Sequence, residues 1–380
     1  MKKVLLAGTA LLGVVALSTS AQADIDLDLG GYFSGYGVYV DNDEPAGAGL
    51  RNFEFRRDQE IYFTGETTTD MGLTVGVHTE LVPANNTVAP GTAFDETYMY
   101  VSGNWGRFNF GVEDGAAYLL QVEAPSGDSN IDCLRSYVSG FQSDLWNDLA
   151  IDADFAGVTL DYQHADFSQV ERLTYLTPKF NGFQAGLSWA PDNVYYGATG
   201  LQPAGSNVVA GAFENMWEAS ARWDGEFEGF GISLGGGYSH ASTEATAGAG
   251  AVGSDDLTTW NAGANFSFSG FSLGGAYHIT NNGIGATADE DTTTWTVGGA
   301  WDNGPYHVGV SYLDRTYGNG FVGIGAADLE VTRWTVGAGY TYGPGMSFRG
   351  SLSLGKADNN GVAARDVDFT QGTLGTQIDF

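Results

Sequence analysis

The sequence has one cysteine, few cations and no long apolar run in its main part, and each shortage excludes a class of protein. Cys133 alone cannot form an intramolecular disulfide, so no disulfide framework holds the chain. Beyond the first residues, no segment reaches the roughly 18 uninterrupted apolar residues of a transmembrane helix. The formal charge is −31, with 15 Lys and Arg against 46 Asp and Glu. Such a surface repels nucleic acid, and we expect no nucleic-acid partner.

The sequence also lacks a recognisable catalytic arrangement. Its five histidines are scattered, and none has a Ser, Cys or carboxylate partner at a known motif spacing. We therefore expect no enzyme. An assay of lipid or ester hydrolysis would distinguish a membrane-embedded hydrolase from a protein without catalytic activity. The histidines are His78, His164, His240, His278 and His307.

Residues 1–23 have the features of a secretory signal peptide. Two lysines precede an apolar stretch from Val4 to Leu17, which is too short to span a bilayer as a retained helix. Ala21-Gln22-Ala23 then supplies the small residues of a cleavage site. We expect an exported protein whose mature chain is residues 24–380.

From Gly30 onward, short segments alternate apolar and polar residues. In one of them Trp295 and Val297 share a face, while Thr294 and Thr296 share the other. A period of two is typical of β-strands, and the 57 glycines and scarce helix formers agree with an all-β chain. We predict sixteen strands, near residues 27–40, 51–66, 72–81, 95–103, 107–113, 170–178, 182–190, 215–224, 230–240, 257–268, 271–280, 292–302, 305–315, 330–342, 346–356 and 371–380.

The connections alternate between short and long, and aromatic residues lie at both ends of the apolar faces. Both features indicate a transmembrane antiparallel up-and-down β-barrel, closed by the segment that ends at Phe380. A soluble β-sandwich would instead need a core of Val, Ile and Leu. A hairpin within 149–162 would raise the strand count to eighteen. We place short turns around Asp70, Asn104, Asn181-Gly182, Gly225, Ser269-Gly270, Asn303-Gly304 and Pro344-Gly345.

The face opposite the apolar one is polar, as in the set Glu54, Arg56, Asp58 and Glu60. A barrel of sixteen strands is wide enough for such a face to enclose water. Arg57 is the exception, because its parity directs it outward. A cation at mid-depth in lipid costs about 2 to 4 kcal/mol, so we expect Arg57 at a subunit interface, near the rim or after a bulge.

Two segments carry a resemblance to a known family. Residues 105–117, WGRFNFGVEDGAA, precede an unusually long connection, and residues 173–189, LTYLTPKFNGFQAGLSW, follow it. Together with the aromatic terminus at Phe380, they resemble the Gram-negative general diffusion porins, especially the alphaproteobacterial ones. The resemblance implies a homotrimer in the outer membrane of a Gram-negative bacterium, in contact with lipid and lipopolysaccharide. It also implies that the third loop, residues 114–169, folds into the lumen.

In such porins an acidic loop faces a basic wall at the narrowest point of the pore. The long loop here has ten carboxylates and a single Arg, so we expect a preference for cations among the small hydrophilic solutes that diffuse passively. Matched by position, the resemblance implies a constriction made by Arg56, Arg107 and Arg172 of the wall and by Glu113, Asp114, Glu123, Asp128, Asp132, Asp144, Asp148, Asp152 and Asp154.

Two alternatives remain open for the function. The first is a substrate-specific channel, because sugar channels carry an aromatic track and parity directs several tyrosines inward. The second is a structural or adhesive outer-membrane barrel. Saturable block of conductance by a solute would favour a specific channel over general diffusion. The inward tyrosines are Tyr32, Tyr36, Tyr62, Tyr98 and Tyr100.

Metal and subunit contacts are further expectations. Clustered carboxylates suit Ca²⁺ or Mg²⁺, although solvated loops are the simpler account, and we expect no other cofactor. Trimer contacts would use outward apolar residues near the chain ends. The acidic clusters are Asp41, Asp43 and Glu44, and Asp289, Glu290 and Asp291. The candidate trimer contacts are Leu27, Leu29, Phe33, Phe53 and Phe55.

Overall fold

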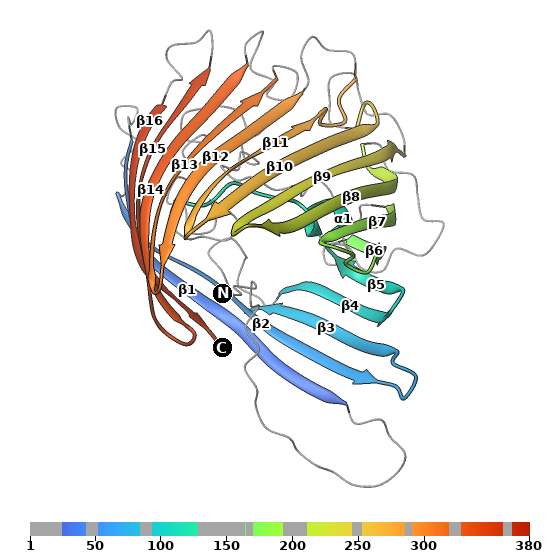
Figure 1. Cartoon of the computed structure of the whole chain (residues 1–380). Helices are drawn as coiled ribbons and strands as arrows, with labels where there is room; N and C mark the ends of the chain where they lie inside the picture. Colours follow the sequence, from blue (N-terminus) through green and yellow to red (C-terminus); the bar gives the residue numbers. More distant parts are fainter. Residues whose placement is uncertain are drawn as a thin grey trace.

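The described part of the chain consists predominantly of β-strands (Figure 1). The computed structural model describes residues 25–42, 52–83, 93–127, 164, 170–192, 211–244, 253–285, 291–318, 328–359 and 367–380. Its strands are β1 (Asp26–Asn42), β2 (Phe53–Thr68), β3 (Thr74–Val82), β4 (Ala93–Gly103), β5 (Gly106–Glu113), β6 (Val170–Leu176), β7 (Phe183–Asp192), β8 (Phe213–Phe227), β9 (Phe230–Thr243), β10 (Leu257–Phe268), β11 (Phe271–Thr280), β12 (Thr292–Asn303), β13 (Tyr306–Tyr317), β14 (Leu329–Gly343), β15 (Met346–Asn359) and β16 (Val367–Asp379). The predicted number of sixteen is confirmed.

The strands form one closed antiparallel barrel, in which each pairs with its neighbours in the chain and β1 pairs with β16. The backbones of Gly31 and Phe380 exchange hydrogen bonds of 2.9 and 3.0 Å at this seam. Closure satisfies every sheet edge, which is the condition for β-structure in lipid. Because β5 pairs directly with β6, no further strand lies between these two in the barrel. The eighteen-strand alternative is therefore wrong.

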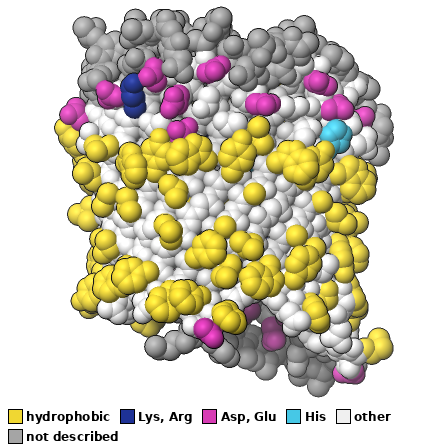
Figure 2. All heavy atoms as spheres, turned by 45° about the horizontal axis from the view of Figure 1, so that its top comes forward, with side chains coloured by type: hydrophobic (Ala, Val, Ile, Leu, Met, Phe, Trp, Pro, Cys, Tyr) yellow, Lys and Arg dark blue, Asp and Glu magenta, His cyan; other side chains and the backbone are white. Residues whose placement is uncertain are grey.

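Side-chain parity separates a lipid face from a lumen face. On β12, Trp295 and Val297 are exposed, whereas Thr294 and Thr296 are buried on the opposite face. Figure 2 shows the hydrophobic side chains of one side of the barrel gathered in two bands, with acidic side chains beyond both of them and most densely beyond the upper one. The two predicted aromatic levels correspond to these bands.

Arg57 lies on the outer face, as parity predicts. It is exposed and lines a shallow pocket of about 450 Å³ together with Phe33 and Phe55. The register between β1 and β2 is unbroken from Asp26↔Glu66 to Tyr39↔Phe53. A bulge therefore does not explain the position of Arg57, and the rim or a subunit interface remains.

Several tight turns contain residues with positive φ. Asn181 and Gly182 have φ of 48° and 84°, and Ser269 and Gly270 have φ of 51° and 87°, the backbone of two-residue hairpins that match the twist of the strands. The turn expected around Gly225 is wrong. Strand β8 continues to Phe227, because the positive φ falls on Glu228 and Gly229 instead.

The one helix in the described part of the chain is α1 (Ala116–Leu119), a single turn after β5. No helix in the described segments is long and apolar enough to cross a membrane. Figure 1 shows α1 and the chain that follows it on the inner side of the strands. The lumen therefore contains a segment of backbone in addition to the side chains of the wall.

Candidate functional site

Residues 114–127, here called the lumen strap, run along the inner wall. The strap begins with α1, whose first N–H groups have no partner within the helix. The wall supplies those partners, since Ala116 N donates to Ser188 Oγ at 2.8 Å and Ala117 N to Glu218 Oε2 at 2.9 Å. Ser220 Oγ in turn donates to Ala116 O at 2.5 Å. These contacts fix the start of the strap on β7 and β8.

Beyond α1, the strap lies in a trough of wall glycines. A Cβ at Gly263 would overlap the Val122 carbonyl, and a Cβ at Gly298 would overlap that of Pro125. The strap backbone therefore lies closer to the wall than it could if these wall positions carried side chains. The trough glycines are Gly186, Gly235, Gly237, Gly263, Gly274, Gly298 and Gly309, on β7 and β9–β13.

Polar wall side chains hold the strap along its length. Arg222 Nη1 donates to Gln121 O at 3.1 Å, and Asn261 Nδ2 donates to Ala117 O at 3.2 Å. Nearer the end, His307 Nε2 lies 3.2 Å from Ser126 O. The strap is therefore anchored from β8 to β13.

His164, from the later part of the long connection, is buried beside the strap. Its backbone N donates to Gln121 Oε1 at 3.1 Å. Its ring nitrogens contact Ser239 Oγ and, at 2.9 Å, Asn261 Nδ2. Two parts of the connection thus meet on the same region of wall.

The three predicted wall arginines lie on the lumen face but in separate environments. Arg172 and Glu218 form a buried ion pair of 2.7 Å, with side chains 2% and 5% exposed. The Arg107 guanidinium lies 3.9 Å from the Tyr100 ring centroid. Arg56 is half-buried on β2.

Three predicted acidic residues lie in the described part of the chain. Glu113 is buried and accepts a hydrogen bond of 2.5 Å from Asn109 Nδ2. Asp114 is buried at the start of the strap, and half-buried Glu123 accepts one of 2.9 Å from Gln121 Nε2. The other predicted constriction residues, Asp128, Asp132, Asp144, Asp148, Asp152 and Asp154, lie outside the described residues.

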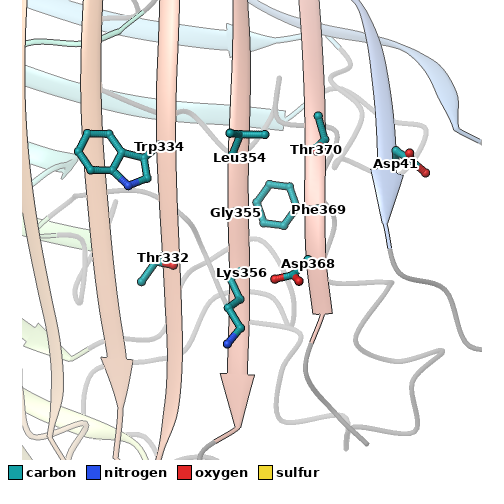
Figure 3. A pocket seen from close by; sticks show the side chains of 9 residues that line it. All are labelled: Asp41, Thr332, Trp334, Leu354, Gly355, Lys356, Asp368, Phe369 and Thr370. Carbon is teal, nitrogen blue, oxygen red and sulfur yellow. The ribbon is translucent and has the colours of Figure 1, made fainter. Parts of the chain in front are cut away.

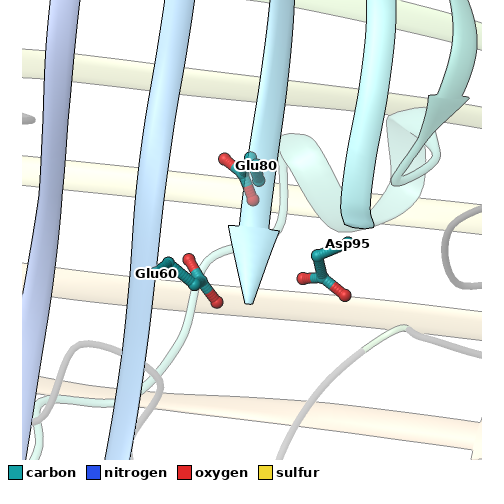
Figure 4. Close-up of side chains that lie close together, drawn as sticks. All are labelled: Glu60, Glu80 and Asp95. Atoms are coloured by element: carbon teal, nitrogen blue, oxygen red, sulfur yellow. The ribbon is translucent and has the colours of Figure 1, made fainter. Parts of the chain in front are cut away.

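The β2–β4 wall carries an acidic group that the constriction prediction did not single out. Carboxylate oxygens of Glu60, Glu80 and Asp95 lie within 4.8 Å of one another (Figure 4). Two further acidic residues lie on the same strands, Glu66 on β2 and Glu96 on β4. The alternation of residues along β2 and β3 already directs Glu60 and Glu80 inward, so their position was predictable from the sequence. Their proximity to Asp95 of a third strand was not predictable. Four lumen arginines were also missed, and parity could have found them: Arg222, Arg315, Arg333 and Arg349.

A pocket is lined by residues of β14, β15, β16 and β1 (Figure 3). It has a volume of about 420 Å³, and Trp334 and Leu354 of its lining are exposed on the lipid face. Of the predicted metal-binding clusters, only Asp41 and Asp291 lie in the described residues, and both are exposed. The other members, Asp43, Glu44, Asp289 and Glu290, lie outside them, and the Ca²⁺ site stays a prediction.

Comparison with known proteins agrees with this architecture. No protein of curated function matches the chain. Among solved structures, an anion-selective porin from Comamonas acidovorans is 17% identical with a TM-score of 0.59, covering 94% of this chain and 100% of that one. A loop-deletion mutant of OmpT, an outer membrane protein of Vibrio cholerae, is 13% identical with a TM-score of 0.57, at 94% and 99% coverage. A mutant of the Rh. blastica porin is 19% identical with a TM-score of 0.54, at 93% and 100% coverage.

At these identities the structures show a shared fold alone. The family model of the Gram-negative porins matches residues 7–361, nearly the whole chain. This match, the closed sixteen-strand barrel and the polar lumen confirm an outer-membrane channel and not an enzyme. The chain belongs to the Gram-negative porin family.

Proposed function

We propose that this porin is a trimeric, cation-preferring channel for passive diffusion of small hydrophilic solutes. The observation that carries the preference is the acidic group on the β2–β4 wall, where Glu60, Glu80 and Asp95 bring their carboxylates together. A charge on the wall acts on an ion that passes within about one Debye length, about 8 Å at physiological salt. The field of these carboxylates therefore attracts cations and repels anions with incomplete screening.

Three of the lumen arginines are engaged with the wall and therefore oppose this field less than free cations would. Arg172 is paired with Glu218 at 2.7 Å, and Arg222 with Asp224 at 3.0 Å. Arg315 is buried against Thr294 and Tyr317. An anion-selective lumen needs cations directed at passing solutes, whereas these guanidinium groups are engaged with the wall.

The outer face of β1 and β2 supports a trimer. Its apolar side chains include Leu27, 67% exposed, and Phe55, 75% exposed. Lipid would cover such residues equally well, but lipid does not accommodate the neighbouring Arg57 at low cost. A partner subunit that offers Arg57 an acceptor resolves the conflict.

A reversal potential tests the preference. Purified protein in planar bilayers under a KCl gradient should give a potential of the sign set by K⁺, and the potential should shrink as salt rises. A potential of the sign set by Cl⁻ contradicts the proposal. A series of neutral polymers tests passive diffusion, for which uptake should fall with size and show no saturation.

A further inference from the structure

Aromatic rings from four neighbouring strands form a continuous row on the lumen wall. The ring centroids of Tyr32 and Tyr62 lie 6.4 Å apart, those of Tyr62 and His78 5.9 Å, and those of His78 and Tyr98 5.3 Å. Tyr100 follows Tyr98 at 6.4 Å. The first four rings are half-buried, so part of each is open to the lumen. We call these five residues the lumen aromatic row.

Carboxylates fix the row from its edges. The Tyr62 hydroxyl donates to Glu60 Oε2 at 2.7 Å, and His78 Nε2 lies 3.0 Å from Glu80 Oε1. A hydroxyl that donates to a carboxylate keeps its ring in one orientation and places negative charge at the ring edge. Two more hydroxyls do the same: Tyr32 to Asp58 at 2.7 Å and Tyr100 to Glu66 at 2.5 Å.

One end of the row already holds a cation of the chain itself. The Arg107 guanidinium carbon lies 3.9 Å from the Tyr100 ring centroid and 5.8 Å from that of Tyr98. Both distances are within the range of a cation–π interaction. The faces of this row therefore accept a planar cation.

The same chemistry continues along the row toward Tyr62. The acidic group of Glu60, Glu80 and Asp95 (Figure 4) lies there, since Glu60 is hydrogen-bonded to Tyr62 and Glu80 contacts His78. Because the hydroxyl hydrogens are donated to carboxylates, the wall offers a ligand mainly acceptors and ring faces. A cation uses both and is in addition attracted by the negative charge of the carboxylates, an attraction that a neutral sugar lacks.

From this arrangement we infer that the lumen aromatic row is a binding site for small organic cations that carry a quaternary ammonium, protonated amine or guanidinium group. The inference rests on the proposed water-filled, cation-preferring channel, through which such solutes reach the row. Organic cations bound at the row cross the pore with saturable flux, while neutral solutes and inorganic ions still diffuse past it without saturation.

Choline is a suitable probe, because it is small, permanently charged and lacks an extended apolar surface. Choline added to one side of a planar bilayer holding the full-length protein should reduce the K⁺ current saturably. Tyr62→Leu should raise the half-blocking concentration about fivefold, the loss expected for one cation–π contact. Tyr62→Phe keeps the ring face and should retain block even if the leucine variant folds poorly. Tyr306→Leu, on the lipid face, is the matched control and should leave block unchanged.

Two outcomes would overturn the inference while leaving the channel intact. One is normal K⁺ conductance with no saturable effect of choline. The other is block by glucose at the same concentrations, which assigns the row to neutral sugars. Absence of any conductance, in contrast, would contradict the proposed channel itself.

Discussion

Arg172 on β6 and Glu218 on β8 form an ion pair of 2.7 Å inside the barrel, with both side chains almost fully buried. The same carboxylate accepts the Ala117 N–H of α1 at 2.9 Å. One side chain thus joins the wall to the lumen strap. Both the stability of the barrel and the shape of the pore should therefore depend on Glu218.

Replacing Glu218 with alanine should destabilise the barrel by about 3 kcal/mol, because it removes the buried partner of Arg172. It should also change single-channel conductance, since α1 loses a wall contact. Denaturant unfolding in micelles and bilayer recordings measure the two effects. Glu226→Ala, exposed on the same strand, is the control. Wild-type conductance in Glu218→Ala would show that this contact does not position the strap.

Gly263→Ala should displace the strap, because the new Cβ would overlap the Val122 carbonyl. Overpacking of this kind costs about 1 to 3 kcal/mol. We expect altered single-channel conductance together with reduced stability. Gly372→Ala is the control, since a Cβ there meets nothing within 4 Å. If both variants conduct like the wild type, the trough does not seat the strap.

Neutralising the acidic group should reduce the preference for cations. In the double variant Glu60→Gln/Glu80→Gln, two of three neighbouring carboxylates lose their charge while side-chain size is retained. The reversal potential under a KCl gradient should move toward zero, and most strongly at low salt. Glu226→Gln, outside the acidic group, should behave as the wild type; an equal shift in it would point to a general effect of net charge.

Arg57→Leu distinguishes a subunit interface from lipid. If Arg57 faces a partner subunit, the variant should dissociate to monomers at a lower temperature, as followed by gel mobility after heating in mild detergent. Val308→Ala, exposed on β13, should leave trimer melting nearly unchanged. A higher melting temperature in Arg57→Leu would instead indicate contact with lipid, where removing the charge is favourable.

Gly229→Ala tests the turn between β8 and β9. Gly229 has φ of +85°, and an L-residue in this region costs roughly 1 to 2 kcal/mol. A Cβ there makes only an ordinary contact at 4.0 Å, so the effect should be conformational. Urea unfolding should show this loss, and Gly343→Ala, without positive φ, should not. Equal stability of the two variants would mean that the turn tolerates alanine.

Parity predicted the wall well because a period of two fixes each side chain to lipid or lumen. Trp295, Thr296 and Arg57 all lie on the predicted face for this reason. The rule needs no knowledge of neighbouring strands except where a register shift breaks the alternation, as between Phe94 and Thr97 on β4. The strand count and the polar lumen were therefore accessible from the sequence.

Turn position was less accessible, because several glycines compete for it. Gly225 and Gly229 lie four residues apart, and both suit a hairpin. The register of β8 with β9, from Phe213↔Thr243 to Phe227↔Phe230, selects Gly229. Pairing across strands decides here, and a single strand does not contain that information.

The site was predicted least, because it depends on contacts between distant strands. The sequence indicates that Arg172 faces inward but not that Glu218 pairs with it. Likewise, wall glycines such as Gly263 and Gly298 have no apparent purpose until the strap is known to lie on them. The row from Tyr32 to Tyr100 needs the registers of four strands before its rings become neighbours.

The glycine trough also sets an order of assembly. The strap leaves the wall after β5, yet its seat is built by β7 and β9–β13, which follow the strap in the chain. The strap therefore cannot make all of its contacts with the wall until most strands of the barrel have assembled. Its final seating should come late in biogenesis, and a chain truncated before β13 should expose the strap to periplasmic proteases.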